Sequence, residues 1–208
     1  MTLLFGYVVM SSTYSMRHHN LQIVMSHTII VRKGVFCPDP KETNSTTMML
    51  NNLPDIKQKD VLDMGCGTGI IGIYCVLNGA RRVVAVDINE KAIENAKENV
   101  ERNKIGHIVK VIKSDLFENV EGSFDCIFGN LPINDEAWNL EIPTAELMKK
   151  FLSECGGHIR KDGIVYFTWN SGADVVQIRD FLAVKGCRFE EVRENKAGTT
   201  WYLFKLHF

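Results

Sequence analysis

Four glycines that follow an aspartate make up the stretch of this sequence best suited to hold a small ligand. The sequence places Gly65, Gly67, Gly69 and Gly72 after Asp63, with apolar residues on both sides. Glycines at alternate positions keep side chains off one side of a turn, so that backbone N–H groups can approach a ligand. A carboxylate just before them would repel a pyrophosphate and attract a cation. The pattern therefore favours a ligand with positive charge, although a tight turn without a ligand would use the same glycines.

A second stretch with chemical potential is Asn130-Leu131-Pro132, directly after an apolar run that begins at Phe124. Residues at the carboxyl end of a central parallel strand face the ligand crevice of an open sheet. The side-chain oxygen of Asn130 could accept a hydrogen bond from a substrate amino group, and so could the carbonyl of Leu131, where Pro132 bends the chain. Two acceptors would aim the nitrogen lone pair at a neighbouring electrophile, which is an effective form of catalysis. An ordinary turn is the alternative.

Two more acids follow predicted strands. The predicted strand at residues 82–86 ends at Asp87, and the predicted strand at residues 107–112 leads to Asp115. Asp87 lies about 20 residues beyond the glycines, where an acid can accept hydrogen bonds from both hydroxyls of a ribose. The start of a helix also favours an acid at this position. An aspartate after a strand is otherwise common in loops, so Asp115 alone indicates little.

Strand and helix patterns alternate between residues 51 and 208, which predicts an α/β domain. The short connection at residues 193–198 predicts that the last two strands pair antiparallel. Asn89 is expected to cap the helix that follows Asp87. The predicted strands are 61–64, 82–86, 107–112, 124–130, 163–169, 187–192 and 199–207, and the predicted helices are 70–77, 89–102, 144–155 and 173–184.

Residues 1–50 are expected to form a short N-terminal β/α extension on the substrate side of this domain. Residues 21–25 and 28–31 are short apolar runs that suggest two strands, arranged as a hairpin. Two prolines then fix an extended segment, after which Asn44 or Ser45 can cap a short helix.

Composition restricts the classes of function. The chain has 208 residues with 24 basic and 25 acidic side chains, so a large surface that coats nucleic acid is not indicated. Its six cysteines are scattered without a Cys-x-x-Cys pair, which argues against a zinc site and for reduced thiols in a cytoplasmic protein. The apolar residues 1–10 are too short for a membrane span and lack the charged start of a signal peptide. We therefore expect neither a metal nor a membrane.

The stretch from Val61 to Gly72 resembles the first motif of the class I S-adenosylmethionine-dependent methyltransferases. That resemblance implies a Rossmann-like, doubly wound sheet of seven strands, six parallel and one antiparallel. It implies that Asp63 acts at the methionine end of S-adenosyl-L-methionine, that the glycines lie against its ribose and methionine, and that Asp115 binds the adenine amine. The implied cofactor residues are Asp63, Gly65, Cys66, Gly67, Gly69, Asp87, Ile88, Asp115 and Leu116.

Asn130-Leu131-Pro132-Ile133 resembles the Asn-Pro-Pro-Tyr/Phe motif of methyltransferases that act on planar nitrogens, such as adenine N6 and glutamine N5. Residues 35–43 resemble the segment before the first motif in the release-factor glutamine and ribosomal RNA methyltransferases, with one extra residue. Together these stretches imply an N-methyltransferase for an RNA base or a protein glutamine, with Asn130, Leu131 and Pro132 as catalytic residues. Ile133 replaces the aromatic ring that would stack on a flat substrate.

Two other classes of function remain. A nicotinamide-dependent oxidoreductase would explain Gly67 to Gly72 and Asp87, but it leaves Asp63 and Asn130 without a role. A binding protein that keeps the methyltransferase fold without turnover would explain why Ile133 replaces an aromatic residue. Because the N-terminal extension is short, an activating partner subunit could contribute to substrate recognition.

Overall fold

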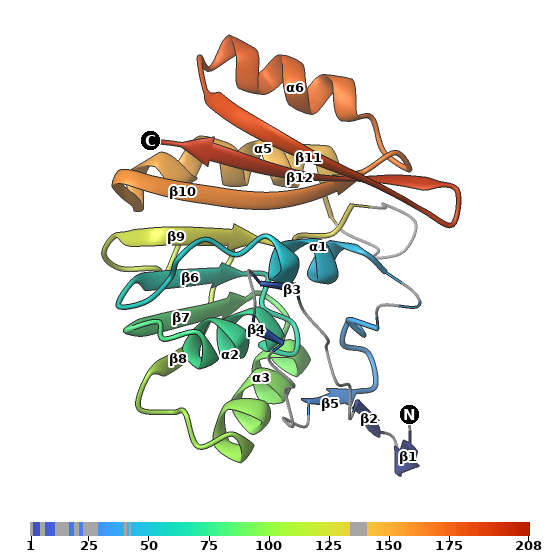
Figure 1. Cartoon of the computed structure of the whole chain (residues 1–208), viewed down its shortest axis with the longest axis vertical. Helices are drawn as coiled ribbons and strands as arrows, with labels where there is room; N and C mark the ends of the chain where they lie inside the picture. The colour runs from blue at the N-terminus through green and yellow to red at the C-terminus, as the bar shows by residue number, and fades with distance from the viewer. Residues whose placement is uncertain are drawn as a thin grey trace.

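A seven-stranded sheet in the order β11-β12-β10-β9-β6-β7-β8 forms the centre of the fold (Figure 1). The computed structural model describes residues 29–39, 41, 43–133 and 141–208, and the backbone of four short strands before them. Only β12 runs antiparallel to the rest of this sheet, which confirms the predicted six parallel strands and one antiparallel strand. The strands are β6 (Asp60–Met64), β7 (Arg82–Asp87), β8 (Val109–Lys113), β9 (Phe124–Gly129), β10 (Ile159–Asn170), β11 (Arg188–Lys196) and β12 (Thr199–His207).

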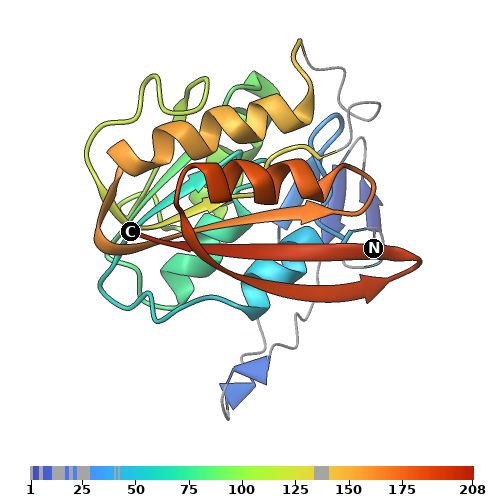
Figure 2. The same cartoon turned by 90° about the horizontal axis from the view of Figure 1, so that it is seen from above.

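Helices cover both faces of the sheet, as Figures 1 and 2 show. One apolar cluster joins the first three helices to one face, and a second joins the last two helices to the other face. Alternate strand residues contribute to the two clusters; for example, Val61 packs in the first and Leu62 in the second. The helices are α1 (Ser45–Asn51), α2 (Ile70–Leu77) and α3 (Glu90–Arg102) on one face, and α5 (Thr144–Glu154) and α6 (Val175–Val184) on the other.

The β11–β12 hairpin is longer than the sequence predicts. Its strands pair from Arg188 with His207 as far as Lys196 with Thr199, so the expected connection at 193–198 shrinks to two residues. The turn residues Ala197 and Gly198 have φ values of 49° and 79°, which match the right-handed twist of a hairpin. In Figure 1 the tip of this hairpin projects beyond the sheet on the side where α1 lies.

The N-terminal strands pair differently from the expected hairpin. Strand β5 (Ile29–Arg32) pairs with β2 (Tyr7–Met10), which pairs in turn with β1 (Thr2–Leu4). Strand β4 (Leu21–Gln22) pairs with β3 (Arg17–His18). The prediction of a hairpin between residues 21–25 and 28–31 is therefore wrong, since each segment has a partner earlier in the chain.

Two buried asparagines of α3 hold strand β5. Asn99 accepts a hydrogen bond from the Ile30 N–H at 2.9 Å and donates to the Ile30 carbonyl at 2.8 Å. Asn95 accepts from the Arg32 N–H at 2.8 Å and also donates to the Ile30 carbonyl. Asn99 further donates to the carbonyl of Thr68, at 2.9 Å, in the glycine turn. Strand β5 is thus held by the side chains of α3 in addition to its pairing with β2.

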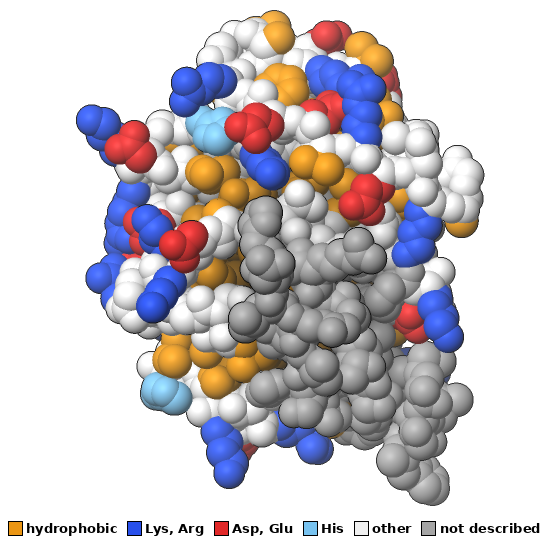
Figure 3. Space-filling model, in the orientation of Figure 1, with side chains coloured by type: hydrophobic (Ala, Val, Ile, Leu, Met, Phe, Trp, Pro, Cys, Tyr) orange, Lys and Arg blue, Asp and Glu red, His pale blue; other side chains and the backbone are white. Residues whose placement is uncertain are grey.

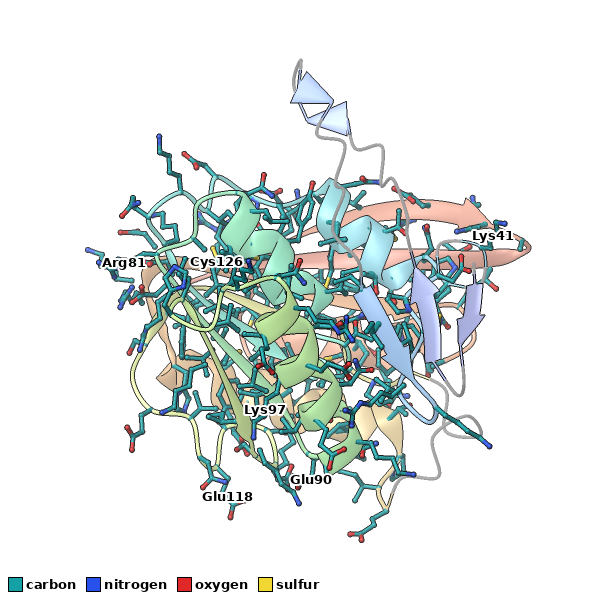
Figure 4. The ribbon with its side chains drawn as sticks, turned by 90° about the horizontal axis from the view of Figure 1, so that it is seen from below. Lys41, Arg81, Glu90, Lys97, Glu118 and Cys126 are labelled. Atoms are coloured by element: carbon teal, nitrogen blue, oxygen red, sulfur yellow. The ribbon has the colours of Figure 1, made fainter. Side chains whose placement is uncertain are left out.

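A cluster of charged residues lies at the amino ends of β6, β7 and β10. Asp60 is 4% exposed and binds Arg81, Arg82 and Arg160 at 2.9, 3.3 and 2.8 Å. Burial raises the pKa of Asp60, but the hydrogen bonds from Arg81 and Arg160 outweigh it and lower the pKa to about 2. Strand β6 begins at this paired Asp60, one residue before the start of the predicted strand 61–64. Arg81 lies at the opposite end of the molecule from Lys41, which is near the hairpin tip (Figure 4).

The surface carries charges of both signs. On the face seen in Figure 3, the described acidic and basic side chains are interspersed. All six cysteines have free thiols. Within the described ranges, no group of three or more potential ligands could hold a metal ion, and no helix is long and apolar enough to cross a membrane.

Candidate active site

The predicted site residues meet along one side of the sheet, where the carboxyl ends of the parallel strands lie; we call this side the carboxyl edge. Strand register places Met64 opposite Val86 and Gly129, so the residues that follow these three leave the sheet next to one another. In strand order, the edge presents Asn130 after β9, Gly65 after β6, Asp87 at the end of β7 and Asp115 beyond β8. The topology therefore brings together stretches that lie far apart in the sequence.

The glycines of the turn have different roles. Gly65, Gly67 and Gly69 have φ values of 71°, 53° and 76°, which favour glycine at all three positions. A Cβ atom at Gly65 would lie 2.9 Å from the Leu131 side chain, so this glycine lets the two stretches touch. A Cβ atom at Gly67 would meet nothing within 4 Å, so this turn is open to a ligand. At Gly69 a Cβ atom would lie 3.3 Å from Ala96 of α3, which indicates a packing role.

Asp63 lies beneath the turn, inside the core. Its side chain is 0% exposed, and one oxygen, Oδ2, accepts a hydrogen bond from the Gly72 N–H at 2.9 Å. The other oxygen, Oδ1, is buried without a hydrogen-bond partner among the described residues. Burial raises the pKa of Asp63 from 3.8 to about 7, and the charge of Asp87 adds to the effect. A buried carboxylate with one unsatisfied oxygen favours a donor or a positive charge close by.

Asp87 fixes the turn from the end of β7. Its Oδ2 accepts from the Gly67 N–H at 3.0 Å, and its Oδ1 accepts from the Asn89 N–H at 2.9 Å. Burial raises its pKa, although backbone N–H groups oppose the shift. Each carboxylate oxygen can accept a further hydrogen bond, so both could still receive ribose hydroxyls. Cys66 extends the hydrogen-bond ladder between β6 and β7 by donating its N–H to the Val86 carbonyl at 2.8 Å. Ile88, next to Asp87, is 61% exposed.

Asp115 lies at the far end of the carboxyl edge. Its Oδ2 accepts a hydrogen bond from Lys150 of α5 at 3.2 Å, and its side chain is 46% exposed. Leu116 adopts a positive φ of 45° and turns its side chain into the core, where it is 5% exposed. Asp115 is therefore accessible for the predicted adenine contact, whereas the Leu116 side chain is not. An open hollow of about 530 Å³ adjoins Asp115, Phe117 and Lys150.

Asn130 is held by two threonines that sequence reasoning missed. Its Nδ2 donates to Thr46 Oγ1 of α1 at 3.1 Å, and its Oδ1 accepts from Thr168 Oγ1 of β10 at 3.0 Å. Thr46 and Thr168 are 1% and 0% exposed, while Asn130 and Pro132 are half-buried. Thr168 lies within the predicted strand 163–169, where a threonine is common and does not by itself indicate a role in the site.

The residues after Asn130 point mostly inward. Leu131 and Ile133 are each 7% exposed and belong to the apolar cluster that includes α5 and α6. The Ile133 side chain therefore contributes to the core rather than to an exposed stacking surface. Trp138, a loop residue that could supply the missing ring, lies outside the described residues. The side chains of His18 and His19, two neighbouring histidines that could be considered as metal ligands, also lie outside them.

The arrangement can hold one ligand and present another to it. Gly67, Asp87 and Ile88 form the open part of the turn. Asn130 directly follows the neighbouring strand β9, and its amide oxygen can accept a second hydrogen bond beside the one from Thr168. Such an arrangement suits a transfer reaction between two neighbouring ligands, because positioning can replace a dedicated acid or base.

Comparison with curated proteins gives relatives that are methyltransferases by name. A Methanocaldococcus jannaschii protein named as a candidate protein N5-glutamine methyltransferase is 38% identical over 136 residues, which cover 60% of this chain and 68% of the relative. A ribosomal protein L11 methyltransferase of Thermosipho africanus is 42% identical over 132 residues, covering 64% of this chain and 45% of the relative. The chain thus spans less than half the length of the second relative.

A solved structure has the same fold. The 16S rRNA N2 G1207 methyltransferase of T. thermophilus, in complex with AdoMet and guanosine, matches with a TM-score of 0.72 at 18% identity. The match covers 100% of this chain and 52% of that chain. The family model described as methyltransferase small domain matches residues 26–201. This match covers most of the chain, and it agrees with the glycine turn, the three aspartates and the Asn-Leu-Pro stretch at one edge of the sheet. The chain therefore belongs to the methyltransferase small domain family.

Proposed function

We propose that the protein is an S-adenosylmethionine-dependent N-methyltransferase that acts on a planar nitrogen, in an RNA base or in the side-chain amide of a protein glutamine. The main observation is the contact between the glycine turn and the Asn-Leu-Pro stretch. Gly65 is close enough to Leu131 that a Cβ atom would not fit between them. A cofactor on the turn and an amine on Asn130 would consequently be neighbours.

The turn suits S-adenosyl-L-methionine better than a dinucleotide. The unpartnered Oδ1 of Asp63 is a negative or acceptor group in the core below the turn, and it would favour a positively charged ligand. Asp87 has acceptor capacity for ribose hydroxyls, and the exposed Ile88 offers an apolar contact. Asp115 is accessible for the adenine amine. When bound, the cofactor supplies an electrophilic methyl group.

Asn130 would orient the substrate nitrogen. Its Oδ1 accepts one hydrogen bond from Thr168 and has capacity for one from a substrate N–H. The Leu131 carbonyl would accept the second N–H, so that the nitrogen lone pair faces the methyl group. No general base is required before attack, because the amine becomes acidic only as it is alkylated.

Two substrate classes are consistent with the site. The relative from M. jannaschii is named for glutamine, and the buried Ile133 removes a stacking ring, which favours a side-chain amide over a flat base. The structure from T. thermophilus contains guanosine. We assign the methyltransferase domain to residues 51–208 and substrate contacts to residues 1–50, with an activating partner subunit as a further source of specificity.

The test combines binding with transfer. Calorimetric titration should show binding of S-adenosylmethionine and S-adenosylhomocysteine, and none of NADH. Labelled S-adenosylmethionine is then incubated with total RNA and with total protein from cells that lack the gene. Asn130→Ala should lower kcat by about 100-fold or more while leaving cofactor affinity unchanged. Equal turnover by the variant would refute the role of Asn130.

The buried Ile133 also favours a second candidate, a protein that binds the cofactor without transferring its methyl group. Full cofactor affinity without transfer to either pool would support this candidate and overturn the first one.

A further inference from the structure

We infer that Thr168 and Thr46 are positioning residues that set the orientation of the Asn130 amide for methyl transfer. This inference rests on the proposed function. The side chain of Asn130 lies between the two threonine hydroxyls, with 3.0 Å from its Oδ1 to Thr168 Oγ1 and 3.1 Å from its Nδ2 to Thr46 Oγ1. The hydrogen bonds join three elements that are far apart in the sequence, α1, β9 and β10.

Two opposed hydrogen bonds restrict the rotation of the Asn130 amide plane. An asparagine side chain turns about two bonds, and its terminal torsion is broad unless partners restrict it. Here one partner lies at the oxygen and the other at the nitrogen, so a rotation of the plane breaks both hydrogen bonds. Thr46 and Thr168 are buried, whereas Asn130 keeps partial exposure. The remaining acceptor and donor capacity of the amide therefore faces the open side of the carboxyl edge.

The two threonines are themselves held by the fold. Thr168 pairs with Leu203 within the sheet, next to the position where β9 leaves it. Thr46 is in the first turn of α1, and residues of the β11–β12 hairpin form hydrogen bonds with the two residues before that helix. Glu194 accepts a hydrogen bond from Asn44 Nδ2 at 2.7 Å, and Lys196 Nζ donates to the Thr43 carbonyl at 3.2 Å.

The Thr168 hydroxyl also limits how many hydrogen bonds Asn130 can still accept. As a donor it uses one of the two acceptor positions on Asn130 Oδ1, which leaves one for the substrate. Without it, Oδ1 could turn toward either side, and the substrate amine would lose its fixed direction. A valine at this position keeps the shape and the strand propensity of threonine but removes the hydroxyl.

The experiment compares Thr168→Val, Thr168→Ser, Thr46→Val and Thr46→Ser with wild type in the same two substrate pools. Each valine variant should lower kcat about tenfold, with KM and the affinity for S-adenosylhomocysteine unchanged. Each serine variant keeps a hydroxyl and should restore most of the loss. Thr200→Val is the matched control, because Thr200 Oγ1 donates to Asn195 Oδ1 at 2.8 Å on the exposed hairpin, and this variant should keep wild-type kcat.

A double-mutant cycle separates positioning from general stability. In the Asn130→Ala background, Thr168→Val should have no further effect on kcat, because the residue it orients is gone. A loss that persists in that background, or a valine variant with wild-type kcat while Asn130→Ala is impaired, would overturn the inference. Unimpaired turnover by Asn130→Ala itself, or no transfer by wild type to either pool, would instead overturn the proposed function.

Discussion

The substitution Asp63→Asn should remove a pH-dependent cost from the free energy of unfolding. The carboxyl group is 0% exposed and burial raises its pKa to about 7, whereas the unfolded chain titrates it near 3.8. Between these two values the native state keeps a proton that the unfolded state has released. The free energy of unfolding therefore falls as the pH rises through this window.

The magnitude follows from the two pKa values. A difference of one in pKa corresponds to about 1.36 kcal/mol, so the gap between 3.8 and about 7 corresponds to about 4 kcal/mol. About 1.6 kcal/mol of this cost is already present at pH 5, and about 2.5 kcal/mol develops between pH 5 and pH 8. Asparagine cannot ionise, so the variant should gain about 2.5 kcal/mol on wild type over that interval.

Urea unfolding of both proteins at pH 5, 6, 7 and 8 measures this gain. The difference between the two proteins is the informative quantity, because all their other side chains are identical. Asparagine can still accept the hydrogen bond from the Gly72 N–H, which preserves the start of α2. A difference that stays constant from pH 5 to pH 8 would mean that Asp63 does not titrate there, and the account of its burial would fail.

Two further substitutions test the turn and the N-terminal strand. Gly65→Ala should lower the free energy of unfolding by about 2 kcal/mol, because Gly65 has a positive φ, and it should also weaken cofactor binding. Gly122→Ala is the control: Gly122 has a φ of 84° and nothing within 4 Å, so this variant should lose the same stability and keep its cofactor affinity. Equal cofactor affinity of both variants in calorimetry would contradict the contact at Gly65. Asn99→Ala should cost about 3 kcal/mol and speed amide exchange at Ile30, because it leaves buried backbone groups without partners. Asn103→Ala, which removes only a hydrogen bond within the end of α3, should leave that exchange slow.

Local patterns predicted the elements that local interactions determine. Asn89 caps α3 as expected, since its side chain accepts from the Lys91 N–H at 3.0 Å. Asn44 also stands before a helix, but its side chain makes no cap and binds Glu194 instead. That partner lies 150 residues away, and no pattern around Asn44 could indicate it. The same type of residue at the same type of position thus takes a local partner in one helix and a distant one in the other.

In the candidate site, too, the sequence predicts the residues that local spacing determines and misses those that depend on distant partners. Asp63, Gly65 and Asp87 are found from sequence because their spacing is set within one strand–turn–helix–strand unit. Thr168 is hidden, because threonine is common in strands and nothing nearby marks this one. Its role emerges only from the register between β9 and β10, which a single sequence does not fix. The role of Asn99 could not be predicted either, because a polar residue on a helix is normally expected to face solvent.

The docking of β5 on α3 has a consequence for how the N-terminal segment can vary. Asn95 and Asn99 bind only the main chain of β5, and its side chains Ile29, Ile30 and Val31 need only be apolar enough to stay buried. The Arg32 side chain is the exception, because it pairs with Glu94 and Glu98 of α3 at 2.7 and 3.0 Å. Strand β5 could therefore be exchanged for another apolar strand that keeps this arginine, while the sheet and its carboxyl edge remain as they are.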